Sequence, residues 1–126
     1  MAEGKGCLYG ALTAAATFAG GDMLNLANPE GADLLITRFI MNVTTEATGA
    51  ATVDAGIAAT GVSNDELVDG ANIGAAPILI DNIAQHVAAA VAAAAVEWGE
   101  DEFLTVTPSA SAAGLVGDYY VEYIRL

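Results

Sequence analysis

Hydrophobic and polar residues alternate with a period of two along much of this chain, a pattern that predicts short β-strands. The clearest run spans residues 33–45, and one of its faces is apolar: Leu35, Phe39, Met41 and Val43. The opposite face is mixed and carries Ile36, Arg38, Ile40 and Asn42. The first face is predicted to be core, and the second is expected to contact another surface.

Further strands are predicted where β-prone residues lie between turn signals. They cover residues 22–27, 51–57, 77–80, 103–107 and 119–126. Residues 51–57 are expected to form a hairpin with residues 33–45, and their inward side chains are small: Ala51, Val53, Ala55 and Ile57. Residues 60–74 are rich in Gly, Asn and Asp, which predicts a long surface loop.

Two segments depart from the alternating pattern. Residues 1–21 are rich in Gly and Ala without a clear period, and we expect an arm or a weakly ordered edge there. Residues 82–96 follow a potential helix cap, Asp81, and consist almost entirely of helix formers. Alanine also fills tight sheets, so helix and strand both stay open for this segment.

The whole pattern predicts one all-β domain with a β-sandwich or jelly-roll-like fold. This domain is expected to cover residues 22–126, with room for one short helix within residues 82–96. The arm is expected to cover residues 1–21. A length of 126 residues is typical of a single domain.

Charge narrows the classes of partner. Three Lys and Arg residues stand against sixteen Asp and Glu residues, for a formal net charge of -13. Phosphate backbones and anionic lipids are bound by clusters of Lys and Arg, so neither nucleic acid nor membrane is an expected partner. The N-terminal residues lack the order of a signal peptide, and we expect synthesis and initial retention in the cytosol.

No arrangement of residues indicates catalysis or a cofactor. Cys7 is the single cysteine, which excludes an internal disulfide, and His86 is the single histidine. The glycines of residues 4–10 lack the flanking strand and helix of a phosphate-binding loop. The acidic residues within 97–102 and 65–69 lack the spacing of an EF-hand calcium loop, and solvated turns explain them better. We therefore expect no enzyme activity, no cofactor and no metal.

Five residues are candidates for an interface. Arg38 and Arg125 lie in the two clearest strands of a chain with one other fixed cation, and each is expected to meet a carboxylate within the subunit or across an interface. Tyr119 and Tyr120 are consecutive in a strand, so one is expected in the core and the other exposed. Trp98 lies in an acidic turn and could stack on a partner protein or a sugar.

Five segments together resemble the small decoration, or cement, proteins of tailed-phage heads. They are residues 28–32, 35–45, 49–58, 64–74 and 112–124. The resemblance covers residues 22–124 and rests on the order and character of the segments, without a catalytic signature. It is weakest in the Ala-rich residues 87–96.

The resemblance implies a β-sandwich or jelly-roll subunit without catalytic chemistry. It implies a homotrimer that sits on the capsid exterior at local three-fold positions and clamps neighbouring major capsid subunits. The resemblance also suggests that the arm reaches over the shell or a neighbour. An alternative from a different class is a non-catalytic binding module, such as a head-fibre or carbohydrate-binding domain that presents Trp98 and a tyrosine to a host glycan.

Overall fold

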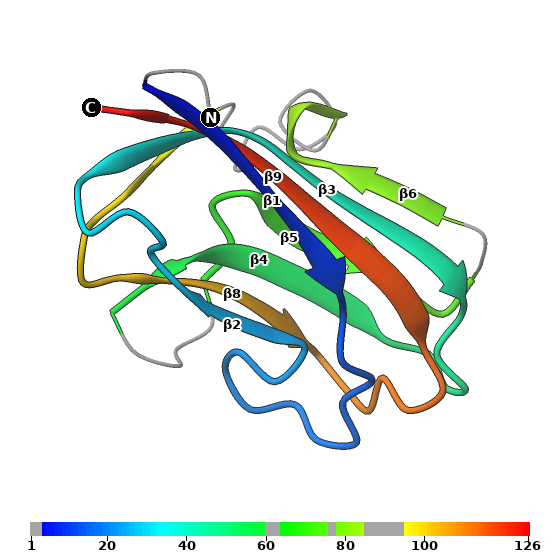
Figure 1. Ribbon diagram of the computed structural model, residues 1–126. Helices are drawn as coiled ribbons and strands as arrows, with labels where there is room; N and C mark the ends of the chain where they lie inside the picture. Colours follow the sequence, from blue (N-terminus) through cyan, green and yellow to red (C-terminus); the bar gives the residue numbers. More distant parts are fainter. Residues whose placement is uncertain (1–3, 60–63, 76–77, 85–94) are drawn as a thin grey trace.

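The computed structural model describes residues 4–59, 64–75, 78–84 and 95–126. These residues form nine strands, and every pairing between them is antiparallel. The strands make two sheets that lie against each other as layers (Figure 1). The all-β sandwich that the sequence predicts is therefore confirmed.

The two sheets share the strands almost equally. Sheet A has the order β1 (Lys5–Ala11), β9 (Val116–Arg125), β3 (Leu34–Thr45) and β6 (Ile78–Asp81), and β7 (Val96–Trp98) also pairs with β3. Sheet B has the order β2 (Leu24–Ala27), β8 (Phe103–Pro108), β4 (Thr52–Ala58) and β5 (Val68–Asn72). In Figure 1, β1 runs alongside β9, which is an inner strand of sheet A.

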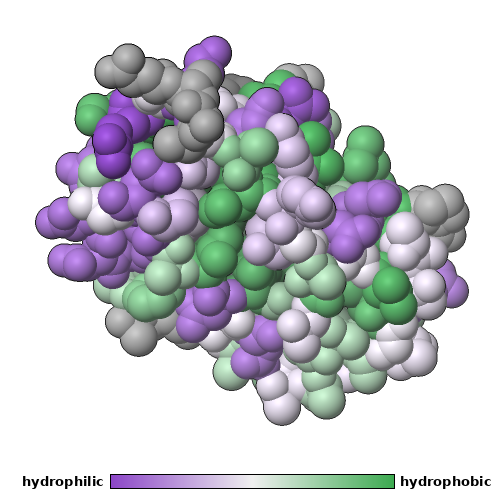
Figure 2. All heavy atoms as spheres, in the orientation of Figure 1, coloured by the Kyte–Doolittle hydropathy of each residue, from purple (hydrophilic) through white to green (hydrophobic). Residues whose placement is uncertain are grey.

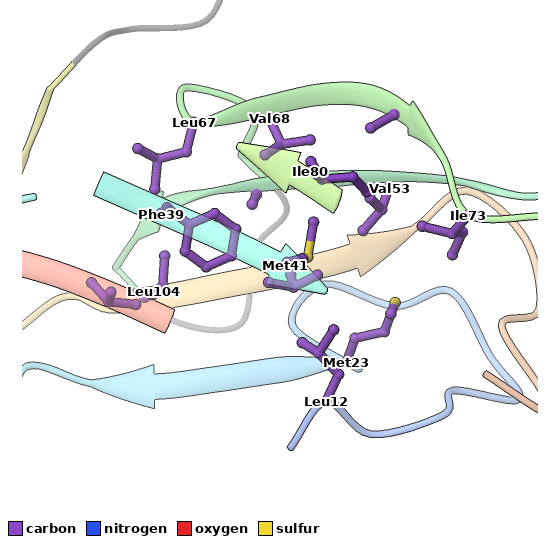
Figure 3. Close-up of a cluster of buried hydrophobic side chains, with 14 of the residues drawn as sticks. Leu12, Met23, Phe39, Met41, Val53, Leu67, Val68, Ile73, Ile80 and Leu104 are labelled. Carbon is purple, nitrogen blue, oxygen red and sulfur yellow. The ribbon is translucent and has the colours of Figure 1, made fainter. Parts of the chain in front are cut away.

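The core fills the space between the sheets. Phe39 and Met41 from β3 meet Leu104 from β8 and Val53 from β4, and all four side chains are buried (Figure 3). The alternation that marked these strands in the sequence places their apolar side chains inward, because successive residues of a strand point to opposite faces. The inward set predicted for residues 51–57 is confirmed: Ala51, Val53, Ala55 and Ile57 are all buried.

The core face predicted for β3 is wrong at the start of the strand. Ile36 is fully buried and Leu35 only partly, although the sequence assigned Leu35 to the core face. The pairing of β3 with β9 shifts register between Ile36 and Arg38, so Thr37 is an extra residue in the strand. Such a β-bulge inverts the alternation, and the core face changes from even to odd residue numbers there.

Three further expectations are corrected or limited by the structure. Strands β3 and β4 lie in different sheets, so they do not form a hairpin. The predicted loop at residues 60–74 contains β5, which pairs with β4. Within residues 82–96, the structure describes helix at 82–84 and strand from Val96, and residues 85–94, with His86, lie outside the described residues.

Residues 5–11 of the predicted arm form β1, the edge strand of sheet A. Two glycines in it, Gly6 and Gly10, lie opposite Tyr123 and Tyr119. A Cβ at Gly6 would overlap the Tyr123 ring, and one at Gly10 would lie 3.0 Å from the Tyr119 hydroxyl. These glycines therefore give the tyrosine rings of β9 room to lie under β1. The reach of the arm over a neighbour stays a prediction.

Candidate interface on sheet A

Arg38 finds a carboxylate within its own subunit. Its Nε donates to Oδ1 of Asp81 at 3.0 Å, and its Nη2 contacts Oδ2 of the same residue. Because β3 and β6 are adjacent, this two-point ion pair joins the neighbouring strands. Burial acts to raise the pKa of Asp81, but hydrogen bonds from Arg38 and the Ile83 backbone outweigh it and lower that pKa below its ordinary value.

Arg125 also meets a carboxylate of its own subunit, at the end of the sandwich. Its Nη2 lies 3.5 Å from Oε1 of Glu30, and the Tyr123 hydroxyl donates to Oε2 of Glu30 at 3.1 Å. Burial and the Glu30 carboxylate raise the pKa of Tyr123, so its hydroxyl stays protonated as a donor. Each arginine therefore has a carboxylate partner within its own subunit.

The scarcity of cations pointed to both arginines, but sequence reasoning missed their partners. Asp81 was interpreted as a helix cap, and its Oδ1 accepts a hydrogen bond from the Ile83 backbone N–H at 2.8 Å, which is consistent with that role. Glu30 belongs to the Asn-Pro-Glu-Gly turn after β2. Its carboxylate meets β9 only because β3 brings that turn back to sheet A. No spacing in the sequence could have identified either partner.

Tyr119 and Tyr120 lie on opposite faces of β9, as predicted. Tyr119 is partly buried and packs against the core, whereas Tyr120 is 36% exposed on the other face of β9. Tyr9 of β1 lies directly opposite Tyr120 and is 81% exposed. Sequence reasoning missed Tyr9, because the Gly-rich segment around it was taken for an arm.

Trp98 is not available as a surface contact, which corrects its place among the candidates. Its side chain is fully buried, and its Nε1 donates to the Glu102 carbonyl at 3.0 Å. The Asn28 side chain holds the adjacent backbone by donating to the carbonyls of Trp98 and Gly99, each at 3.0 Å. Trp98 is therefore a core residue, and it cannot stack on a sugar at the surface of this subunit.

The outer face of sheet A is the surface that these strands turn away from sheet B. Its side chains alternate with the core residues: Lys5, Cys7, Tyr9 and Ala11 of β1, Asp118, Tyr120, Glu122 and Ile124 of β9, Arg38, Ile40 and Asn42 of β3, and Leu79 of β6. Leu79 is 68% exposed. Figure 2 shows hydrophobic residues exposed across the middle of the view. Hydrophilic residues gather toward the end of the molecule that carries the C-terminus.

The remaining candidate chemistry gains no geometric support among the described residues. No group of three or more His, Cys, Asp or Glu side chains is placed there to hold a metal ion. The carboxylate of Glu102 accepts a hydrogen bond from the Gly99 backbone at 2.8 Å, so it braces the turn between β7 and β8. Cys7 is exposed and unpaired by any disulfide. Within the same described part, no helix has the length and apolar character needed to cross a membrane.

The likeness to known proteins lies in the fold. No protein-family model matches the chain, and no curated protein matches it. Among solved structures, a chain of "Capsid of Ralstonia phage GP4" has a similar fold, with a TM-score of 0.58 and 18% sequence identity. The match covers 97% of this chain and 84% of that chain. The shared fold therefore includes both sheets rather than a single hairpin or motif.

Proposed function

We propose that this chain is a structural virion protein that decorates the outer surface of a phage capsid and bridges major capsid subunits. The observation that carries the proposal is the fold match over 97% of the chain to a chain from a phage capsid. The segments that resemble decoration proteins support the same role. The proposal includes assembly into a homotrimer on the capsid exterior, and it includes no catalytic step.

The outer face of sheet A gives this role a physical basis. Tyr9, Tyr120 and Leu79 are exposed on one sheet face. Exposed apolar patches on soluble proteins often mark contacts with other proteins. Many copies on a symmetric shell add their contacts together, so the contact of each copy can be weak.

The ion pairs support a rigid clamp. Arg38 joins β3 to β6, and Arg125 joins β9 to the turn before β3. A subunit that bridges two others transmits load through its sheet, and contacts between strands resist shear of that sheet. The strong negative charge fits docking on a basic surface and keeps free copies apart in solution.

Particles produced with and without this gene test the proposal. We expect the protein in purified particles, and we expect particles that lack it to form shells that release their nucleic acid at a lower temperature. A complementing copy of the gene should restore the release temperature. Absence of the protein from purified particles, or unchanged heat resistance without it, would contradict the proposal.

A further inference from the structure

A hollow of about 400 Å³ lies on the outer face of sheet A beside the two exposed tyrosines. Its lining includes Tyr9 of β1, Tyr120 and Asp118 of β9, and Ile40 and Asn42 of β3. Tyr9, Tyr120 and Ile40 form one row across the sheet, and Asp118 and Asn42 belong to the next row. On the outer face, the hollow thus combines the phenol rings of Tyr9 and Tyr120 with the aliphatic side chain of Ile40 and the carboxylate of Asp118.

The charge of the hollow is not neutralised within the described residues. Asp118 is exposed, and neither ion pair of the described residues includes its carboxylate. No Lys or Arg lines the hollow. A carboxylate beside aromatic rings suits a guanidinium, which pairs with the carboxylate through two N–H groups and stacks on the rings.

A second copy of this chain is a poor source of that guanidinium. Both arginines are engaged within the subunit, Arg38 with Asp81 and Arg125 with Glu30. Two copies, each with a net charge of -13, also repel each other. Charge complementarity therefore favours a different protein with a basic surface.

We propose that this hollow receives an arginine side chain from a partner protein with a basic surface. The inference rests on the proposed function in one respect, because it takes the major capsid protein as that partner. The Asp118 carboxylate pairs with the guanidinium, which lies against the neighbouring rings of Tyr9 and Tyr120. Ile40 contacts the methylene groups of the arginine.

Solution NMR with a small probe tests the hollow without any capsid. N-acetyl-arginine amide is titrated into the labelled protein, and N-acetyl-citrulline amide is the neutral control of the same shape. We expect the arginine probe to shift the amide signals of Tyr9, Asp118 and Tyr120, and the citrulline probe to bind about tenfold more weakly. Equal shifts with both probes, or shifts spread over sheet B, would overturn the proposal.

Two matched variants separate a specific contact from general charge. Asp118→Asn removes the carboxylate of the hollow, and Asp101→Asn removes one exposed charge on the turn between β7 and β8. We expect about a tenfold loss of affinity for the arginine probe with D118N and no loss with D101N. Equal affinity in the two variants would contradict the assignment. Melting curves show whether each variant remains folded.

Binding to purified shells that lack the protein distinguishes this inference from the proposed function. Wild type and D101N are expected to saturate the shells, while D118N and Tyr9→Ala require at least about tenfold more protein. If all four proteins bind equally, the proposed function stands and the hollow is not the docking site. If wild type fails to bind but the arginine probe still occupies the hollow, the capsid is not the partner and the basic-partner site stands.

Discussion

Gly6 lies directly opposite Tyr123 in the β1–β9 pair, and the Tyr123 ring occupies the space that a Cβ at residue 6 would need. The ring reaches past β1 to Glu30, which accepts a hydrogen bond from its hydroxyl at 3.1 Å. An aromatic ring that covers a cross-strand glycine shields the exposed backbone and stabilises the pair. The glycines of the edge strand thus allow the tyrosine rings of β9 to pack against its backbone.

Gly6→Ala is expected to destabilise the protein by about 1–3 kcal/mol, because the Tyr123 ring must move and its contact with Glu30 is strained. Urea unfolding measures the change. Gly49→Ala is the matched control, because a Cβ at Gly49 meets nothing within 4 Å. Equal stability of the two variants would show that the Tyr123 ring does not depend on Gly6.

The β-bulge in β3 predicts opposite outcomes for two neighbouring residues. Ile36→Ala should cost about 2–5 kcal/mol, because Ile36 is fully buried and its loss leaves a cavity. Leu35→Ala should cost clearly less, because Leu35 is only partly buried. Thermal or urea unfolding of both variants decides the matter. A larger loss for Leu35→Ala would place the bulge elsewhere in the strand.

The Arg38–Asp81 pair predicts a dependence on pH. The pKa of Asp81 is lowered in the folded protein, so the contribution of the pair is complete above the ordinary pKa of Asp, about 3.9, and is lost as pH falls through the lower folded value. The stability lost in Arg38→Ala should therefore be largest near pH 6 and shrink below about pH 4.

Lys5→Ala controls for the general loss of one positive charge, because neither ion pair of the described residues includes Lys5. Unfolding curves for both variants and wild type over the acid range give the comparison. Parallel curves for Arg38→Ala and Lys5→Ala would show that the ion pair adds nothing specific to stability.

We predict that removal of the Asn28 side chain lowers the stability of the protein more than its partial exposure would suggest. Its amide donates to the carbonyls of Ala32, Trp98 and Gly99, and its side-chain oxygen accepts from the Glu30 backbone at 2.9 Å. Asn28→Ala should destabilise the protein by about 1–3 kcal/mol, because several backbone groups lose their partner together.

Trp98 fluorescence during urea unfolding measures the effect of Asn28→Ala, since Trp98 is buried beside the contacts that are lost. Asn25→Ala is the control, because Asn25 is an exposed residue of β2. An unfolding midpoint for Asn28→Ala equal to that of Asn25→Ala would refute the bracing role of Asn28.

Much of the fold follows from local patterns in the sequence. The alternation in β3, β4 and β8 identified strands and most of their inward residues, because burial on one face requires a period of two. The bulge at Thr37 was not predictable, since one extra residue leaves the composition of the strand unchanged. The pairing of strands into two sheets depends on contacts between distant residues, and the expected hairpin of β3 with β4 failed for that reason.

Only some residues of the candidate interface could be predicted from the sequence. The arginines stood out because cations are scarce, and the consecutive tyrosines because β-strands alternate. Tyr9 was missed because Gly6 and Gly10 suggested a weakly ordered segment, although the same glycines admit the rings of β9. Trp98 was misplaced because charged neighbours suggested exposure, whereas its indole packs inward from a very short strand.

A reconstruction of intact particles by electron cryo-microscopy tests the proposed decoration role most directly. We expect density for the sandwich on the outside of the shell, with the outer face of sheet A against the major capsid subunits and an arginine density beside Asp118 and Tyr120. Density for the sandwich only inside the shell, or its absence from the particle, would contradict the decoration role.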